Sequence, residues 1–338
     1  MVRFFENYPL KHYNTFGLDS LARYFFEFTE PDDLPAFLGS EKYIKELPLL
    51  ILGGGSNILF INDFKGVILY PKIPGINICA EDRQHIRIEA GAGEVWDDLV
   101  KYCVDAGLGG VENLSDIPGS VGAAPVQNIG AYGQEAGNVI ELVKGYDLGK
   151  HEFLEFNNSE CQFAYRESLF KRELKNRFVI TSVVFRLDKF PRYNLSYGKV
   201  EELVTAMGEV NLQNIRKAVK DIRSSKLPDV NTLGNAGSFF KNPVTDKRTA
   251  EEIKSVYSDM PLYPAGEGKV KLAAGWLIEQ AGWRGRRSGN AGVYNKQALV
   301  LVNYGTATGQ EIYNLSEEIS RSVFEKFGIR LDREVNCV

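Results

Sequence analysis

The sequence has few of the side chains on which metal enzymes and many hydrolases depend. It contains only three histidines, His12, His85 and His151, and none of them has a partner at the spacing of a metal site. Its four cysteines, Cys79, Cys103, Cys161 and Cys337, lie far apart and form no C-x-x-C pair, so we interpret most of them as small core residues. These shortages argue against metalloenzymes, redox dithiols and hydrolases built on a Ser-His or Cys-His pair. We therefore expect no bound metal.

Long apolar runs and a strong excess of one charge are also missing. No stretch is long enough to span a bilayer, and the N-terminal MVRFFENYPLKHYNTF lacks the apolar core of a signal peptide. The net charge of −4 gives no electrostatic case for nucleic acid binding. With 44% hydrophobic and 25% charged residues, the composition is that of an ordinary globular protein. We expect a cytoplasmic protein without membrane or nucleic-acid partners, acting as a monomer.

Hydrophobic periodicity predicts alternating strands and helices. Strands are expected at residues 22–28, 47–52, 66–70, 85–91 and 178–187, and helical apolar faces at 95–104, 212–222 and 312–327. Gly107 is a plausible C-cap, Thr308 and Glu311 have capping-box spacing, and Gly328 should stop the last helix. The helix over 212–222 must end before Pro228, and we expect it to open a third domain. No repeat or long linker is present, so the class is α+β with mixed sheets and several domains.

What the sequence has in plenty is glycine, 33 residues in all. Three glycine-rich segments, 53–57, 117–133 and 234–240, could cradle phosphates, because backbone N–H groups can converge on an anion where no Cβ intervenes. None is a Walker loop, and in GAGEVW, which resembles a dinucleotide-binding motif, Trp96 takes the place of the third glycine. Each segment alone would ordinarily be a turn. Three in one chain favour a large phosphate-bearing ligand and disfavour a plain NAD-dependent dehydrogenase.

Seven segments in a fixed order resemble one family. They are NTFGLDSLARYF (14–25), ILGGGSNILF (51–60), ENLSDIPGSVGAAPVQNIGAYG (112–133), FAYRESLFK (163–171), GNAGSFFKNP (234–243), KLAAGWLIEQAG (271–282) and LDREV (331–335). Together they look like the UDP-N-acetylenolpyruvoylglucosamine reductases, also called UDP-N-acetylmuramate dehydrogenases, of bacterial peptidoglycan synthesis. The resemblance runs nearly end to end. LSYGKVEEL (195–203) resembles the tyrosine-bearing insertion of the type I branch.

This resemblance implies the architecture and the cofactors. It implies an α+β chain with a two-subdomain FAD-binding fold of the vanillyl-alcohol-oxidase (PCMH) type, at 1–72 and 73–208, with the insertion near 190–203. A C-terminal α+β substrate-binding domain at 209–338 would follow, its last segment returning to the active site. NADPH would reduce the FAD, which would then reduce the enolpyruvyl group of UDP-N-acetylglucosamine enolpyruvate. No histidine lies in a matching attachment motif, so we expect noncovalent FAD.

The family reaction delivers hydride from flavin N5 to C3 of the enolpyruvyl group, and a proton then goes to C2. Arg166 and Glu334 match the residues that stabilise the enolate, and Ser238 matches the proton donor. A guanidinium can grip a carboxylate with two parallel donors, and a protonated glutamic acid could donate a hydrogen bond to the enolate. Without the resemblance, the three would be a surface ion-pair arginine, a solvated glutamate and a turn serine beside an aromatic pair.

The remaining site residues are also implied by the resemblance. The FAD contacts would be Gly53, Gly54, Gly55, Ser56, Asn57, Ile117, Pro118, Gly119, Ser120, Gly122, Gln127, Asn128, Gly130, Tyr132 and Arg223. The sugar nucleotide would contact Tyr197, Lys226, Asn242 and Gln297, with the lysine and the tyrosine near its pyrophosphate. Lys226 and Lys241 are candidates to activate the Ser238 hydroxyl, since serine alone is a weak acid.

Two other classes remain open. Another flavin enzyme of the same fold would share the FAD loops but lack the set of Arg166, Ser238 and Glu334. A non-catalytic flavin or sugar-nucleotide sensor would explain the glycine loops but not those three residues. Bound FAD that NADPH reduces and the enolpyruvyl substrate reoxidises would separate the reductase from both alternatives.

Overall fold

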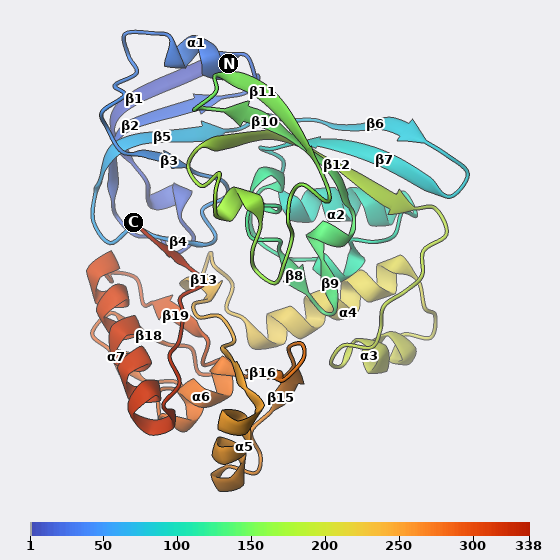
Figure 1. Cartoon of the computed structure of the whole chain (residues 1–338), viewed down its shortest axis with the longest axis vertical. Coiled ribbons are helices and arrows are strands. Elements are labelled where there is room, and N and C mark those ends of the chain that lie inside the picture. The colour runs from blue at the N-terminus through green and yellow to red at the C-terminus, as the bar shows by residue number, and fades with distance from the viewer. Residues whose placement is uncertain (1) are drawn as a thin grey trace. The chain divides into compact units, whose positions relative to one another are not determined.

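The computed structural model describes residues 2–338 and divides them into two units, each with its own sheets and core (Figure 1). Unit 1 holds the chain up to residue 8 together with residues 22–54 and 65–225. Unit 2 holds residues 9–21, 55–64 and 226–338. The chain thus crosses between the units several times, and the predicted α+β class with mixed sheets is confirmed.

The first sheet of unit 1 has the strand order β1-β2-β5-β3. Its strands are β1 (Val2–Pro9), β2 (Leu21–Phe28), β5 (Phe64–Pro71) and β3 (Leu49–Ile51), and β3 runs parallel to β5. Aromatic side chains fill its core: Phe26 stacks on Phe37 of α1 (Asp33–Leu38) with ring centroids 3.9 Å apart. The strand predicted for 47–52 is shorter than expected, because Pro48 has no N–H for the ladder and a glycine run follows Leu52.

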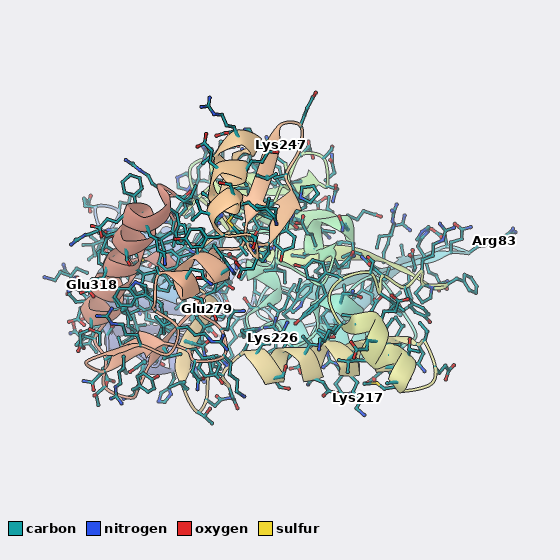
Figure 2. All side chains as sticks on the ribbon, turned by 90° about the horizontal axis from the view of Figure 1, so that it is seen from below. Arg83, Lys217, Lys226, Lys247, Glu279 and Glu318 are labelled. Atoms are coloured by element: carbon teal, nitrogen blue, oxygen red, sulfur yellow. The ribbon has the colours of Figure 1, made fainter. Side chains whose placement is uncertain are left out.

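The second sheet of unit 1 has five antiparallel strands in the order β11-β10-β12-β7-β6. They are β11 (Glu152–Asn157), β10 (Ile140–Asp147), β12 (Phe178–Asp188), β7 (His85–Gly91) and β6 (Ile76–Glu81). Strand β12 lies at the centre and is buried along most of its length, which explains its nearly continuous apolar sequence. Arg83 lies in the turn that joins β6 to β7 (Figure 2). The strands predicted at 85–91 and 178–187 are confirmed.

Helices and short elements complete unit 1. The helices are α2 (Trp96–Asp105), α3 (Val200–Ala206) and α4 (Leu212–Lys226), with short 3-10 helices η2 (Glu112–Leu114), η3 (Val121–Ala123), η4 (Ala136–Asn138) and η5 (Leu169–Lys171) and the hairpin β8 (Gly130–Ala131) and β9 (Gln134–Glu135). Gly107 follows α2 with a left-handed φ of +74°, as predicted for a helix end. Helix α4 packs with α3 and also contacts α2, and it is grouped with unit 1 rather than with the residues after it.

Unit 2 contains three small sheets and a hydrophobic core to which its strands and helices both contribute. The sheets are β13 (Gly234–Ser238)-β19 (Val300–Asn303)-β18 (Ala291–Val293)-β17 (Arg287–Ser288), β14 (Val244–Asp246)-β16 (Lys269–Leu272)-β15 (Leu262–Pro264), and the parallel pair β20 (Asn336–Cys337)-β4 (Ile58–Leu59). The helices are α5 (Lys247–Val256), α6 (Ala274–Gln280), α7 (Gly309–Phe327) and the 3-10 helix η1 (Lys11–Tyr13). The capping box of Thr308 and Glu311 and the left-handed Gly328 after α7 are both confirmed.

An N-terminal segment is built into unit 2. The buried side chain of Asn303 donates to Phe16 O at 2.8 Å, and a Cβ on Gly234 would collide with the same carbonyl. Residues near the start of the chain therefore belong to the core of the C-terminal half. The division predicted from the sequence has three continuous parts, 1–72, 73–208 and 209–338. It does not place residues 9–21 and 55–64 with the C-terminal part, and it stays a prediction. No helix among residues 2–338 is long and apolar enough to cross a membrane.

Candidate functional site

Two glycine segments of unit 1 meet backbone to backbone. A Cβ on Gly54 would lie 2.7 Å from Cα of Gly119 and 3.1 Å from Ser120 N, and a Cβ on Gly53 would lie 2.8 Å from Ser120 Oγ. Gly122 packs just as closely on Ala92, where an added Cβ would be 2.6 Å from the alanine methyl. Only glycine allows such an approach, because any side chain would separate the segments. Residues 53–54 and 119–122 therefore form one backbone-lined surface.

Trp96 holds the segment that leads into residues 119–122. Its indole Nε1 donates to Leu114 O at 2.9 Å, and its backbone N donates to Gly119 O at 3.0 Å. The residue is buried at the start of α2. The tryptophan that breaks the dinucleotide-binding motif thus has a different use here, since it holds both ends of the 114–119 stretch.

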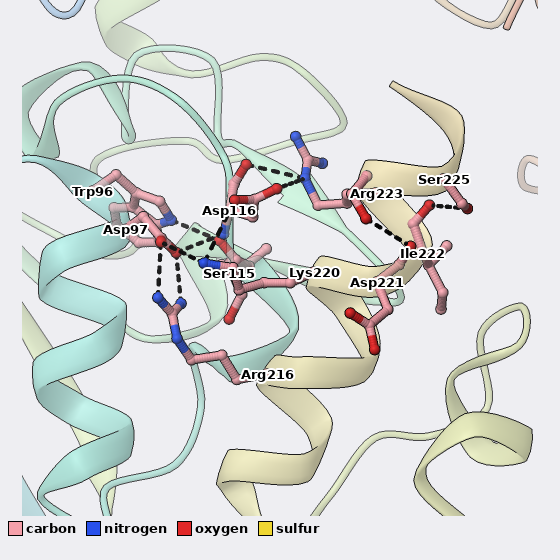
Figure 3. Close-up of polar contacts among 12 residues, drawn as sticks. Trp96, Asp97, Ser115, Asp116, Arg216, Lys220, Asp221, Ile222, Arg223 and Ser225 are labelled. Carbon is pink, nitrogen blue, oxygen red and sulfur yellow. Dashed lines mark hydrogen bonds and ion pairs between the residues drawn. The ribbon is translucent and has the colours of Figure 1, made fainter. Parts of the chain in front are cut away.

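Arg223 brings a partly buried cation beside the same segment (Figure 3). Its Nε donates to Asp116 O at 3.0 Å, and burial lowers the pKa of its guanidinium. Within residues 2–338 its terminal nitrogens have no hydrogen-bond partner. The Arg223 side chain is 15% exposed, so its terminal nitrogens can still be reached, and they suit a ligand that carries carbonyl or anionic oxygens. The glycine surface and these donors together fit an FAD site.

Arg166 lies at the tip of a tight turn in unit 1. Ala164 and Glu167 exchange two backbone hydrogen bonds of 3.0 Å across the turn, and Arg166 has a positive φ of 56°. Its Nη2 donates to Gly130 O at 2.8 Å, and Lys171 Nζ donates to Arg166 O at 2.8 Å. A non-glycine residue with this φ is strained, and such residues concentrate at functional sites.

Asn128 supports the Arg166 turn with its side chain. The amide nitrogen donates to Ala164 O at 3.1 Å and to Glu135 Oε2 at 2.7 Å, while the amide oxygen accepts from Gly137 N at 2.8 Å. The side chain is therefore committed to the protein, and the backbone N–H donates to Pro125 O at 3.3 Å, which leaves the carbonyl of Asn128 as the part available to a cofactor. The structure thus brings two predicted site residues, Asn128 and Arg166, into one loop cluster.

A buried amide joins the tyrosine insertion to the same region. Asn113 Nδ2 donates to Tyr132 O at 2.8 Å and to Asn194 O at 2.9 Å, and Asn194 Nδ2 returns a bond to Gly133 O at 3.0 Å. Tyr197 then lies edge-on to Tyr132, with ring centroids 6.2 Å apart. Tyr197 remains 52% exposed, so its phenol is accessible to a ligand.

In unit 2 the backbone brings Ser238 and Glu334 close together. Ser238 ends β13, and Phe239 O, in the next residue, accepts from Glu334 N at 2.8 Å. The buried rings of Phe239 and Phe240 pack edge to face behind this pairing. Asn57 Nδ2 donates to Glu334 O at 3.2 Å, which ties the glycine run at 53–57 to the C-terminal segment. Arg166 belongs to the other unit, and its meeting with Ser238 and Glu334 stays a prediction.

Two predicted substrate residues each lie against the start of α6. Asn242 Oδ1 accepts from Ala274 N at 3.0 Å, and Gln297 Oε1 would touch a Cβ on Gly275 at 2.9 Å. Lys226 ends α4 as an exposed side chain and is grouped with unit 2 (Figure 2).

The other predicted FAD residues are divided between the units. Gly55, with a φ of +67°, Ser56 and Asn57 are in unit 2, whereas Ile117, Pro118 and Gln127 are in unit 1. Ile117 packs against the core of unit 1.

Substituting Gly54 by alanine tests the glycine surface. The new methyl would press on the backbone of Gly119 and Ser120, which cannot move aside as a flexible side chain can. Overpacking of this kind costs about 1–3 kcal/mol, so we expect FAD affinity to fall about 10- to 100-fold. FAD titration of the variant measures this. Gly39→Ala is the matched control, since its Cβ would sit at an ordinary 3.5 Å from Pro35 O, and equal affinity loss in both variants would contradict the interpretation.

Sequence reasoning did not single out several residues that shape these loops. Asp97, Asn113, Asp116 and Arg216 make the hydrogen bonds that hold the segments in place. Asn113 and Asp116 lie inside the ENLSDIPG stretch of residues 112–119, so their position next to the predicted FAD loop could have marked them as residues that support it. Nothing in the sequence pairs Asp97 with Arg216, which lies more than a hundred positions later.

Comparisons with known proteins identify relatives over the whole chain. Residues 26–149 match the family model described as FAD binding domain, and residues 228–338 match UDP-N-acetylenolpyruvoylglucosamine reductase, C-terminal domain. The chain is 45% identical to a UDP-N-acetylenolpyruvoylglucosamine reductase from Flavobacterium johnsoniae, covering 98% of the chain and 99% of the relative. It is 47% identical to one from Neisseria gonorrhoeae, covering 97% and 95%. The crystal structure of a reductase of that name from Thermus caldophilus has a similar fold, with a TM-score of 0.68 at 23% identity, covering 100% of this chain and 98% of that one.

Proposed function

The chain belongs to the UDP-N-acetylenolpyruvoylglucosamine reductase family, and from this premise we propose that it uses NADPH to reduce UDP-N-acetylglucosamine enolpyruvate to UDP-N-acetylmuramate for peptidoglycan synthesis. It is an oxidoreductase and a flavoprotein whose cofactor is FAD. The observation that carries the chemical proposal is the bond from Glu334 N to Phe239 O, which puts a hydroxyl and a carboxyl on adjoining segments of unit 2. We propose that the protein acts in the cytoplasm as a monomer.

Bound FAD supplies hydride chemistry, and the chain supplies the surface that receives the cofactor. We assign the pyrophosphate to backbone N–H groups of the glycine run 53–57 and of residues 119–122, because close glycine backbones present several donors to an anion. We assign Arg223 to the isoalloxazine, since its Nε is fixed on Asp116 O and its terminal nitrogens are left to donate to a ligand. The other assigned contacts are Ile117, Pro118, Gln127, Asn128, Gly130 and Tyr132.

The three catalytic residues have separate tasks in this proposal. Arg166 stabilises negative charge that develops on the enolpyruvyl carboxylate, because a guanidinium stays protonated and can form two parallel bonds to it. Glu334 in its protonated form donates a hydrogen bond to the same enolate. Ser238 delivers the proton to C2. Its hydroxyl must recover that proton from a neighbouring group or water, for which Lys226 and Lys241 are the candidate activators.

The sugar nucleotide is assigned to residues of both units. Tyr197 is exposed and held beside Tyr132, so its phenol can meet a phosphate. Lys226 adds an exposed ammonium for the pyrophosphate. Asn242 and Gln297 each lie against the start of α6, where their amides suit the polar parts of the sugar nucleotide.

A two-step reduction and oxidation experiment tests the function. The purified protein should be yellow, lose its flavin absorbance when NADPH is added without oxygen, and recover it when the enolpyruvyl sugar nucleotide follows. Recovery with oxygen but not with the sugar nucleotide would instead indicate an oxidase. A flavin that neither NADPH nor the substrate affects would indicate a non-catalytic sensor and overturn the proposal.

A further inference from the structure

Asp116, which immediately precedes the residues assigned to FAD, is held at both its backbone N–H and its carbonyl (Figure 3). Its backbone N donates to Asp97 Oδ1 at 2.6 Å, and its carbonyl oxygen accepts from Arg223 Nε at 3.0 Å. Its φ is +62°, a left-handed value that side chains rarely adopt, although aspartate tolerates it better than most. Hydrogen bonds at both its backbone N–H and its carbonyl hold it in this conformation, and the one to the Asp97 carboxylate is charge-assisted.

Asp97 is in turn locked by α4. Arg216 donates to both of its carboxylate oxygens, at 2.6 and 2.8 Å, and the two side chains are only 12% and 24% exposed. Lys220 lies 3.9 Å from the carboxylates of both Asp97 and Asp116. Although burial alone raises the pKa of Asp97, its bonds to Arg216 and to Asp116 N bring the pKa below its ordinary value. Asp97 is therefore a charged acceptor in a fixed place.

One face of α4 carries this arrangement. Arg216 and Arg223 are about two turns apart, so they project from the same side of the helix. Arg216 fixes the carboxylate that holds the Asp116 N–H, and Arg223 holds the Asp116 carbonyl directly. The direction in which the chain enters residues 117–122 is thus set by α2 and α4 together.

We propose that Asp97, locked by Arg216, is a positioning residue for FAD: it holds Asp116 in its left-handed conformation and thereby keeps residues 117–122 in the geometry that receives the cofactor. The inference rests on the proposed function, in which residues 117–122 contact FAD. Asp97 itself touches neither FAD nor substrate in this proposal.

Two substitutions separate the charge from the acceptor. Asp97→Ala removes both, and we expect FAD to dissociate about 10- to 100-fold more readily, the effect of losing one hydrogen bond to a charged group. Asp97→Asn keeps an oxygen for Asp116 N but loses the ion pair, so its effect should be smaller. Release of FAD from the holoenzyme, followed by the rise in flavin fluorescence, measures both. Arg216→Gln alone should release FAD about as readily as Asp97→Asn. The double variant that carries both substitutions should release FAD only slightly faster than either single variant, because the two residues act as one pair.

The chain offers a matched control for general destabilisation. Asp147 is 1% exposed, pairs with Nε and Nη2 of Arg177 at 3.0 Å each, and accepts from the backbone N of Gly149 at 2.7 Å. Asp147→Ala should lower the melting temperature of the holoenzyme at least as much as Asp97→Ala. It should leave FAD release at the parent rate, because it holds a turn after β10 and not the FAD segment.

The outcomes distinguish this inference from the function on which it rests. Parent-like FAD release from Asp97→Ala, or equal loosening by Asp147→Ala, would overturn it. If Gly54→Ala loosens FAD while Asp97→Ala does not, only the positioning role fails. If neither variant affects FAD, the assignment of these loops to the cofactor fails as well. Should Asp97→Ala not fold, Asp97→Asn and Arg216→Gln decide the question, since parent-like release from both would refute it.

Discussion

Replacing Ser238 by alanine should leave reduction by NADPH near the parent rate and slow reoxidation by the enolpyruvyl substrate about 10²- to 10⁴-fold, the usual contribution of a positioned general acid. The first half-reaction delivers no proton to C2, whereas the second requires one. Alanine keeps the Cβ, so the pairing of Ser238 with Val300 on β19 and the Phe239–Glu334 bond should persist. Stopped-flow measurement of flavin absorbance in each half-reaction separates the two rates.

The Ser238 prediction has a matched control in the same unit. Ser255 is an exposed serine whose hydroxyl donates to Glu252 O within α5. Ser255→Ala should retain both half-reactions. Reoxidation of the Ser238 variant at the parent rate would show that another group protonates C2, and a slow first half-reaction would show that the serine acts before proton delivery.

Replacing Arg166 by alanine should lower turnover about 10²- to 10³-fold, comparable to removing one donor that stabilises a developing oxyanion. The guanidinium is already aimed by its bond to Gly130 O, so its charge is in place before the substrate arrives. Arg166→Lys keeps the charge but loses the planar fork, and we expect only partial activity. Steady-state kinetics with the enolpyruvyl substrate, together with the flavin content of each variant, measure the effect.

A second arginine of the same loop region serves as control for Arg166. Arg172 donates to Gln162 Oε1 at an exposed position, and Arg172→Ala should leave turnover within a few-fold of the parent. Turnover of Arg166→Ala at that level would exclude an electrostatic role. Loss of FAD from Arg166→Ala, with normal turnover after FAD is added back, would assign the residue to cofactor binding instead.

Much of the local structure followed from short-range patterns. The strands at 85–91 and 178–187, the left-handed Gly107 and Gly328, and the capping box of Thr308 were predictable, because each depends on residues within a few positions of one another. The glycine segments were predicted to bring backbone N–H groups to an anion, because glycine has no Cβ. The packing of residues 53–54 against 119–120 was seen only in the structure. The extent of the strand at 47–52 was wrong, although Pro48 was visible in the sequence.

The site required contacts that local patterns do not encode. The sequence marked Ser238 and Glu334 only through a family resemblance, whereas the structure places them by pairing Phe239 with Glu334. The sequence placed Trp96 on a helical apolar face and in a failed glycine motif, but only the structure shows that its indole holds Leu114 O. The grouping of α4 with unit 1 likewise depends on its contacts with α2 and α3, not on its position in the chain.

By itself the sequence determined the α+β class, most element types, the glycine-lined backbone and, through seven matching segments, the reductase family. Only the tertiary structure decided that residues 9–21 and 55–64 belong with the C-terminal half and that Asp97, Asp116 and Arg216 form one network. The physical reason is the range of the interactions. Periodicity and caps are set within a turn or a strand, but the Asp97 carboxylate on α2 meets Arg216 on α4 only after the chain has folded and both side chains have become mostly buried.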